Sequence, residues 1–126
     1  MKVLIVNTHD NFGGAAIAAY RLHQALRQTG VNSRMLVQYK LTCDDTILGP
    51  HWGLQISFAR IRRYLDRHLV NFYPERDGQA TWSINAFPHF IAAKINAQNS
   101  DIVHLHWIGS DYVPVSEIPK IKKPII

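Results

Sequence analysis

A strand-loop-helix pattern at the start of the chain constrains its fold more than any other feature. Residues 3–6 form a continuous aliphatic run, which is typical of a strand that a parallel sheet buries on both faces. A polar loop follows and ends in the adjacent Gly13 and Gly14, after which apolar residues recur at helical spacing until Gly30 provides a stop. The apolar face expected of this helix consists of Ala15, Ala18, Leu22, Ala25 and Leu26. A second strand predicted over residues 34–39 completes a β-α-β unit with a right-handed crossover.

The rest of the chain continues this alternation of strands and helices. In chain order, the predicted segments are a loop at 40–53, a helix over 54–69, a break at 73–78, a helix over 91–97, a strand over 102–107, one or two helical turns within 116–123, and the start of a strand at 124–126. We find no repeat and no linker between domains, so the 126 residues form at most one domain. The fold class expected is α/β, with an open, mostly parallel, Rossmann-like sheet and flanking helices.

Charge and cysteine content bound the environment of the protein. Fourteen Lys and Arg against nine Asp and Glu give a formal net charge of +5, which favours an anionic partner such as a phosphate-bearing ligand or an acidic membrane surface. The single cysteine, Cys43, excludes an internal disulfide framework and a cysteine zinc site. No apolar run is long enough for a signal peptide or a membrane span. We therefore expect a cytoplasmic protein, either free or in peripheral contact with the inner face of the membrane.

In a parallel α/β sheet, ligands bind at the carboxyl ends of the strands, and the first such place here is the loop after residues 3–6. Gly13 and Gly14 at the start of a helix would let backbone N–H groups approach a phosphate, with the helix dipole favouring the anion. The glycines could equally serve the turn alone. The spaced glycines of a dinucleotide site and the Gly-Lys-Ser/Thr of a P-loop are absent. His9, Asp10 and Asn11 belong to the same loop and are candidates for the substrate crevice.

The second place is the end of the strand predicted over residues 102–107. His104 and His106 share one face of it, while Leu105 and Trp107 share the other. His104 lies deeper and is expected to be a satisfied core histidine, whereas His106 and Trp107 are better placed to line the crevice. No further ligands at metal spacing complete a metal site, and no nucleophile with a paired base can be assembled. We therefore expect neither a metal nor a catalytic residue in this part of the chain.

The helix predicted over 54–69 is basic and amphipathic. Its apolar stripe is opposed by four arginines, Arg60, Arg62, Arg63 and Arg67. Such residues commonly form a solvated face, but they would also suit an interfacial helix that faces anionic lipid. Nucleic acid is not expected as a partner, because no recognisable binding module accompanies the arginines.

Four segments together carry a resemblance to a known family. They are MKVLIVN at residues 1–7, GGAA at 13–16, SDIVHLHW at 100–107 and KKPI at 122–125. The chain resembles, from end to end, the N-terminal domain of family 4 glycosyltransferases, and most of all the subgroup that builds bacterial exopolysaccharide and colanic-acid-type repeat units. The DIVHLHW string at 101–107 is the most specific of these matches.

The resemblance implies a GT-B fold, in which two Rossmann-like domains face a cleft. The first domain binds a saccharide or lipid-linked acceptor, and the second binds most of a nucleotide-diphosphate sugar. Such enzymes retain anomeric configuration and usually need no metal or other cofactor, and Gly13 and Gly14 match the loop that approaches the donor phosphates. On this basis residues 1–126 are a partial N-terminal domain that lacks the family's Thr-Leu-His-Asp-like motif and the C-terminal donor domain. We expect this part alone to be inactive. The alternative is a stand-alone α/β module that binds or senses a small phosphorylated ligand.

Overall fold

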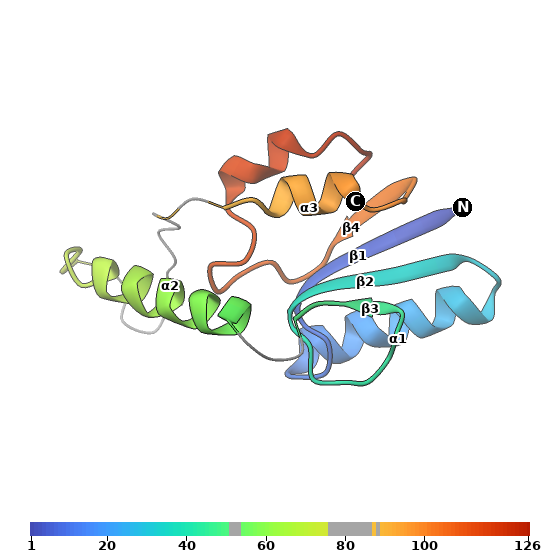
Figure 1. Cartoon of the computed structure of the whole chain (residues 1–126), viewed down its shortest axis with the longest axis horizontal. Coiled ribbons are helices and arrows are strands. Elements are labelled where there is room, and N and C mark those ends of the chain that lie inside the picture. Colours follow the sequence, from blue (N-terminus) through green and yellow to red (C-terminus); the bar gives the residue numbers. More distant parts are fainter. Residues whose placement is uncertain (51–53, 76–86, 88) are drawn as a thin grey trace.

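The computed structural model describes residues 1–50, 54–75, 87 and 89–126, and within it a parallel β-sheet forms the centre (Figure 1). The strands are β1 (Lys2–His9), β2 (Asn32–Tyr39), β3 (Ile47–Leu48) and β4 (Ile102–Leu105). They are ordered β3-β2-β1-β4, and every pairing is parallel. In the register, Ile5 of β1 lies between Met35 of β2 and His104 of β4. The predicted α/β class with a parallel, Rossmann-like sheet is confirmed.

Helices cover both faces of the sheet and extend beyond one end of it. They are α1 (Gly14–Gln28), α2 (Leu54–Val70), α3 (Ile91–Ala97) and the 3-10 helix η1 (Val115–Lys120). In Figure 1, α1 lies on one side of the strands, α3 and η1 lie on the other, and α2 extends away from the carboxyl ends of the strands. None of the helices in the described part of the chain is long and apolar enough to cross a membrane.

The alternation of side chains along β1 divides the core in two. Leu4 and Val6 pack with residues of α3 on one face, while Val3 and Ile5 pack with α1 and β2 on the other. Each of these four side chains is at most 7% exposed. A strand covered on both faces needs apolar residues at every position, which explains the continuous aliphatic run.

The buried face of α1 differs from the predicted one. Ala18 and Ala25 are exposed, and the fully buried positions are Ala16, Ala19 and His23. A polar residue can occupy this face because its two ring nitrogens are satisfied: Nδ1 of His23 lies 2.8 Å from the Ser33 hydroxyl, and Nε2 lies 2.8 Å from the Thr46 hydroxyl. The helix therefore meets the sheet on a stripe rotated from the one that the apolar pattern predicts.

Two segments, within residues 40–53 and 124–126, pair with strands of the sheet, the first of them where a loop was predicted. The predicted loop at 40–53 contains the short strand β3, which pairs with Met35 and Leu36 of β2, while residues 51–53 lie outside the described residues. At the other end, Val103 donates its N–H to the Pro124 carbonyl and accepts one from Ile126, both at 2.9 Å. This parallel bridge lies on the free side of β4, where the start of a strand was predicted.

Candidate functional site

The end of β1 and the loop after β4 lie side by side at the carboxyl end of the sheet. The Thr8 N–H donates to the Trp107 carbonyl at 2.8 Å, and the Thr8 hydroxyl lies 3.0 Å from the carbonyls of Trp107 and Gly109. The Trp107 N–H donates to the side-chain oxygen of Asn7 at 2.9 Å. Asn7 and Thr8 are both fully buried near the end of β1, so they hold this strand end against the loop after β4. The structure thus brings together the two places that the sequence singles out.

The start of α1 is open and has no side-chain cap. Gly13 is the N-cap residue and has a φ of 85°, a left-handed conformation that side chains disfavour. Gly14 begins the helix without a positive φ, and a Cβ added at either glycine would have no heavy atom within 4 Å. No acidic residue lies in the first turn. Among the described residues, no side chain caps the first N–H groups of α1, and the positive end of the helix dipole lies at this point.

Asp10 differs from the expectation that it lines the crevice. It is fully buried, and its carboxylate accepts N–H groups from Leu41 at 2.9 Å and Thr42 at 2.8 Å, and the Thr42 hydroxyl at 2.8 Å. These bonds tie the loop after β1 to the loop after β2. The carboxylate is therefore engaged by the protein and positions the glycine loop rather than facing a ligand.

His9, the last residue of β1, and Asn11, in the loop after it, lie nearer the surface than Asp10. The His9 ring stacks on Tyr39, with centroids 4.9 Å apart, and its Nδ1 is buried without a hydrogen-bond partner among the described residues. Burial lowers the pKa of His9, the charge of Arg63 lowers it further, and Asp10 opposes both effects. His9 is thus a neutral imidazole at neutral pH, with a ring nitrogen that can accept a proton or a hydrogen bond. Asn11 is exposed.

The residues at the end of β4 line the same region. His106 is exposed and Trp107 is 49% exposed. His104 is only partly buried, and its ring meets that of His106 edge-on, with centroids 5.4 Å apart. Burial lowers the pKa of His104, and His106 lowers it further. His104 lies on the edge strand β4 and is therefore less buried than the prediction of a satisfied core histidine requires.

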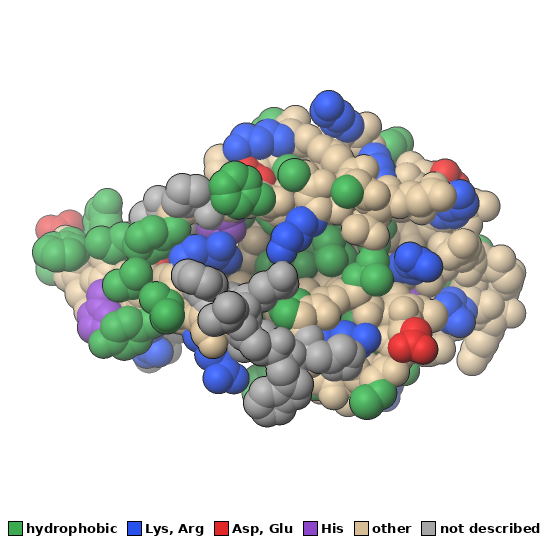
Figure 2. Space-filling view, viewed as in Figure 1, with side chains coloured by type: hydrophobic (Ala, Val, Ile, Leu, Met, Phe, Trp, Pro, Cys, Tyr) green, Lys and Arg blue, Asp and Glu red, His purple; other side chains and the backbone are tan. Residues whose placement is uncertain are grey.

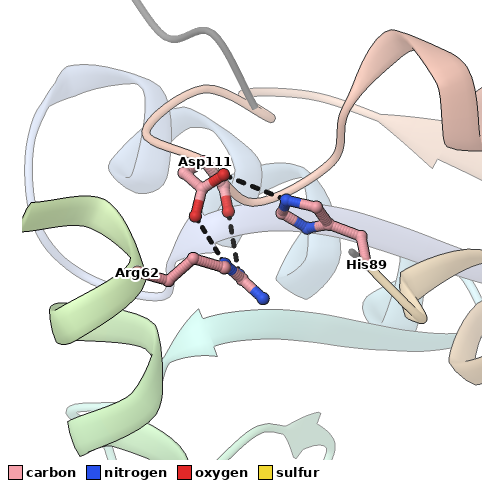
Figure 3. A network of polar contacts seen from close by, with 3 residues as sticks. All are labelled: Arg62, His89 and Asp111. Carbon is pink, nitrogen blue, oxygen red and sulfur yellow. Dashed lines mark hydrogen bonds and ion pairs between the residues drawn. The ribbon is translucent and has the colours of Figure 1, made fainter. Parts of the chain in front are cut away.

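A buried ionic cluster that the sequence does not predict lies beyond these loops (Figure 3). Nε of Arg62, on α2, lies 2.5 Å from a carboxylate oxygen of Asp111, and its terminal nitrogen donates to the Asp111 carbonyl at 3.0 Å. Nε2 of His89 lies 3.0 Å from the other carboxylate oxygen. Burial and then Arg62 lower the pKa of His89, while Asp111 raises it, so a neutral His89 donates this bond. Positions 62, 89 and 111 share no local pattern, which is why no sequence signal points to the cluster.

The cluster borders a cavity of about 450 Å³ between β2 and α3. Its wall combines apolar Leu36 and Ile91 with polar Gln38, His89 and Lys94. Both amide atoms of Gln38 are buried without a partner among the described residues. The hydroxyl of Tyr112, another wall residue, is likewise unpartnered, and burial raises the pKa of this phenol. The cavity could hold a small polar molecule.

The four arginines of α2 do not share one environment. Arg62 is turned to Asp111 and its side chain is 27% exposed, whereas Arg60, Arg63 and Arg67 are exposed. Across residues 1–50, 54–75, 87 and 89–126, no three His, Cys, Asp or Glu side chains gather as metal ligands would. Cys43 is an exposed free thiol.

Comparison with known proteins assigns neither a family nor a function to this chain. No protein-family model, curated protein or solved structure matches the chain.

Proposed function

We propose that this chain forms the acceptor-side part of a retaining glycosyltransferase that uses a nucleotide-diphosphate sugar in surface polysaccharide biosynthesis. The observation that carries the proposal is the uncapped start of α1, which follows the left-handed Gly13 at the carboxyl end of a parallel sheet. Uncapped helix N–H groups behind glycines are suited to a diphosphate. The sequence resemblance to family 4 glycosyltransferases supplies the reaction class.

In the proposed complex, the glycine loop contacts the donor diphosphate, and Asn11, His106 and Trp107 border the sugars. Trp107 offers a half-exposed indole face on which a pyranose ring can pack, and His106 offers a hydrogen-bonding imidazole. Developing charge on the leaving diphosphate would be stabilised by the N–H groups at Gly13 and Gly14. The other basic groups and the catalytic side chains belong, in this proposal, to a second domain that faces the cleft.

The direct test is an NMR titration of the chain with UDP and with inorganic pyrophosphate. We expect the amide resonances of Gly13, Gly14 and Ala15 to shift in a saturable manner, because these groups lie at the start of α1. Gly30 is the matched control, since it also has a positive φ of 81° but follows the far end of the same helix. Shifts at Gly30 alone, or no shift at millimolar ligand, would contradict the proposal.

A stand-alone module that binds a small phosphorylated ligand is the second candidate, and the polar cavity beside Gln38 favours it. In that case the ligand would also perturb Gln38 and Tyr112, which line the cavity. The side-chain amide signals of Gln38 in the same titration separate the two functions. The coding sequence after Ile126 offers a second test, because a frame that continues into another α/β domain supports the transferase.

A further inference from the structure

The outer surface of α2 combines cations with exposed apolar side chains. We refer to Arg60, Ile61, Arg63, Tyr64, Leu65, Arg67 and Phe72 as the α2 face. Ile61 is 56% exposed, Tyr64 is 63% exposed, and Phe72, just after the helix, is 80% exposed. In Figure 2, green hydrophobic and blue basic side chains gather over the part of the molecule where α2 extends from the body. The apolar stripe predicted for this helix is therefore not buried at Ile61 and Leu65, while the side chains of Leu54 and Phe58 lie outside the described residues.

The helical spacing separates this face into two adjacent strips. At about 100° per residue, Arg62, Asp66 and Val70 lie on the side turned to the protein. Arg63, Arg67 and Arg60 follow within about 60° of one another on one flank of the outer side. Tyr64, Ile61 and Leu65 occupy the next about 100°, and the exposed His68 lies among them with its ring edge-on to Tyr64. An apolar strip with cations along its edge is the pattern of a helix that lies in a membrane interface.

Charge and anchoring both favour an anionic surface as the partner. Asp66 is 2% exposed, so the described outer side of α2 presents arginines with no carboxylate between them. Arg62 fixes the helix to the body through Asp111, which keeps the α2 face turned outward. Guanidinium groups at the headgroup level can bind lipid phosphates while the neighbouring apolar side chains enter the acyl boundary.

We propose that the α2 face docks the protein on an anionic lipid bilayer, with α2 lying in the plane of the headgroups. A nucleic acid would match the arginines but would leave Ile61 and Leu65 without an apolar environment. A convex helix surface also offers no groove for a peptide. Because α2 extends from the carboxyl ends of the strands, docking brings the crevice close to the bilayer (Figure 1). The proposal holds whether or not the chain belongs to a transferase.

The test is co-sedimentation of the chain with vesicles of phosphatidylcholine, with and without phosphatidylglycerol, at low salt. We expect binding only to the anionic vesicles. The variant R60Q/R63Q/R67Q should bind on the order of 100-fold more weakly, since each arginine near an anionic surface contributes about fivefold. The matched control is R21Q/R27Q/R34Q, which removes three exposed arginines elsewhere and leaves the same net charge. Equal losses in the two variants would overturn the proposal, because only net charge would then matter.

A second pair of variants tests the apolar strip. I61S/F72S should weaken vesicle binding at least tenfold, while L41S/V115S, which alters two exposed apolar side chains elsewhere, should not. The charge-conserving R60K/R63K/R67K should retain most of the binding, which guards against misfolding as the cause of a loss. Unchanged binding of I61S/F72S, or binding to RNA but not to vesicles, would overturn the proposal.

Discussion

Arg62 and Asp111 lie 49 positions apart in the chain, yet a guanidinium nitrogen and a carboxylate oxygen of this pair are 2.5 Å apart. Asp111 is 1% exposed and has a φ of 59°, and Ser110 before it has the same φ. Two successive residues in the left-handed region are costly for side chains other than Gly, Asn and Asp. The ion pair therefore holds α2 and a strained loop in one arrangement.

Asp111→Asn should destabilise the protein by about 2 kcal/mol, because a charge-assisted bond to Arg62 is lost. Asparagine tolerates the left-handed conformation, so the variant tests the charge and not the backbone. Urea unfolding measures the effect, and the exposed Asp45→Asn is the control with the same change in charge. A double-mutant cycle with Arg62→Gln should give a coupling energy above about 0.5 kcal/mol. Additive losses would show that the pair does not contribute.

The stability of the fold should fall as the pH falls below about 6.5, in part because of His23. Burial lowers the pKa of His23 from 6.5, and Arg27 lowers it further, while Asp44 raises it. Between the folded and unfolded pKa values the unfolded chain binds more protons, so the free energy of unfolding decreases with decreasing pH. A difference of one bound proton between the unfolded and folded states changes the free energy of unfolding by at most about 1.4 kcal/mol per pH unit.

Replacing His23 tests this assignment. The pH dependence of unfolding between about pH 5 and pH 7 should be shallower in His23→Gln than in the wild type, by at most one proton's slope. Some dependence should remain, because His9, His89 and His104 also have lowered pKa values. The exposed His68→Gln serves as the control. An unchanged slope in His23→Gln would contradict the assignment.

The two glycines before α1 should respond differently to substitution. Gly13→Ala should cost about 1 kcal/mol of stability, because its φ of 85° is strained for a side chain. Gly14→Val should leave the free energy of unfolding nearly unchanged, since its Cβ meets no heavy atom within 4 Å. If the Gly14 amide contacts the diphosphate, the added branch should still weaken diphosphate binding. In the enzyme with its donor domain, we expect transfer to lose on the order of 3 kcal/mol of transition-state stabilisation.

Thermal unfolding measured beside donor binding decides the role of Gly14. A parallel loss of stability and binding would indicate that Gly14 serves only the turn. A folded Gly14→Val variant with unchanged binding and kinetics would show that Gly14 does not touch the donor.

Residues 1–126 alone should transfer no sugar. One wall of the proposed cleft cannot provide the interactions that bind a transition state more tightly than the substrates. The measurement is release of free nucleotide diphosphate from UDP-, GDP- and ADP-sugars in the presence of a membrane lipid extract. Turnover above the level of heat-denatured protein would refute the expectation.

Sequence alone predicted the elements whose residues carry a local pattern. The aliphatic run of β1, the bounds of α3 and the parallel β-α-β order follow from periodicity over a few residues. The end of β1 and the end of β4 could be predicted as neighbours, because parallel strands bring their carboxyl ends to one edge.

Tertiary contacts decided the features that no local pattern encodes. β3 consists of two residues and exists through its pairing with β2, and His23 is buried because Ser33 and Thr46 meet its ring nitrogens. The sequence predicted that Asp10 lines the crevice. In the structure its carboxylate is instead buried and accepts hydrogen bonds from the loop after β2. Hydrogen bonds and ion pairs between distant segments depend on side-chain direction in three dimensions, whereas hydrophobic periodicity reports only which side of one element is apolar.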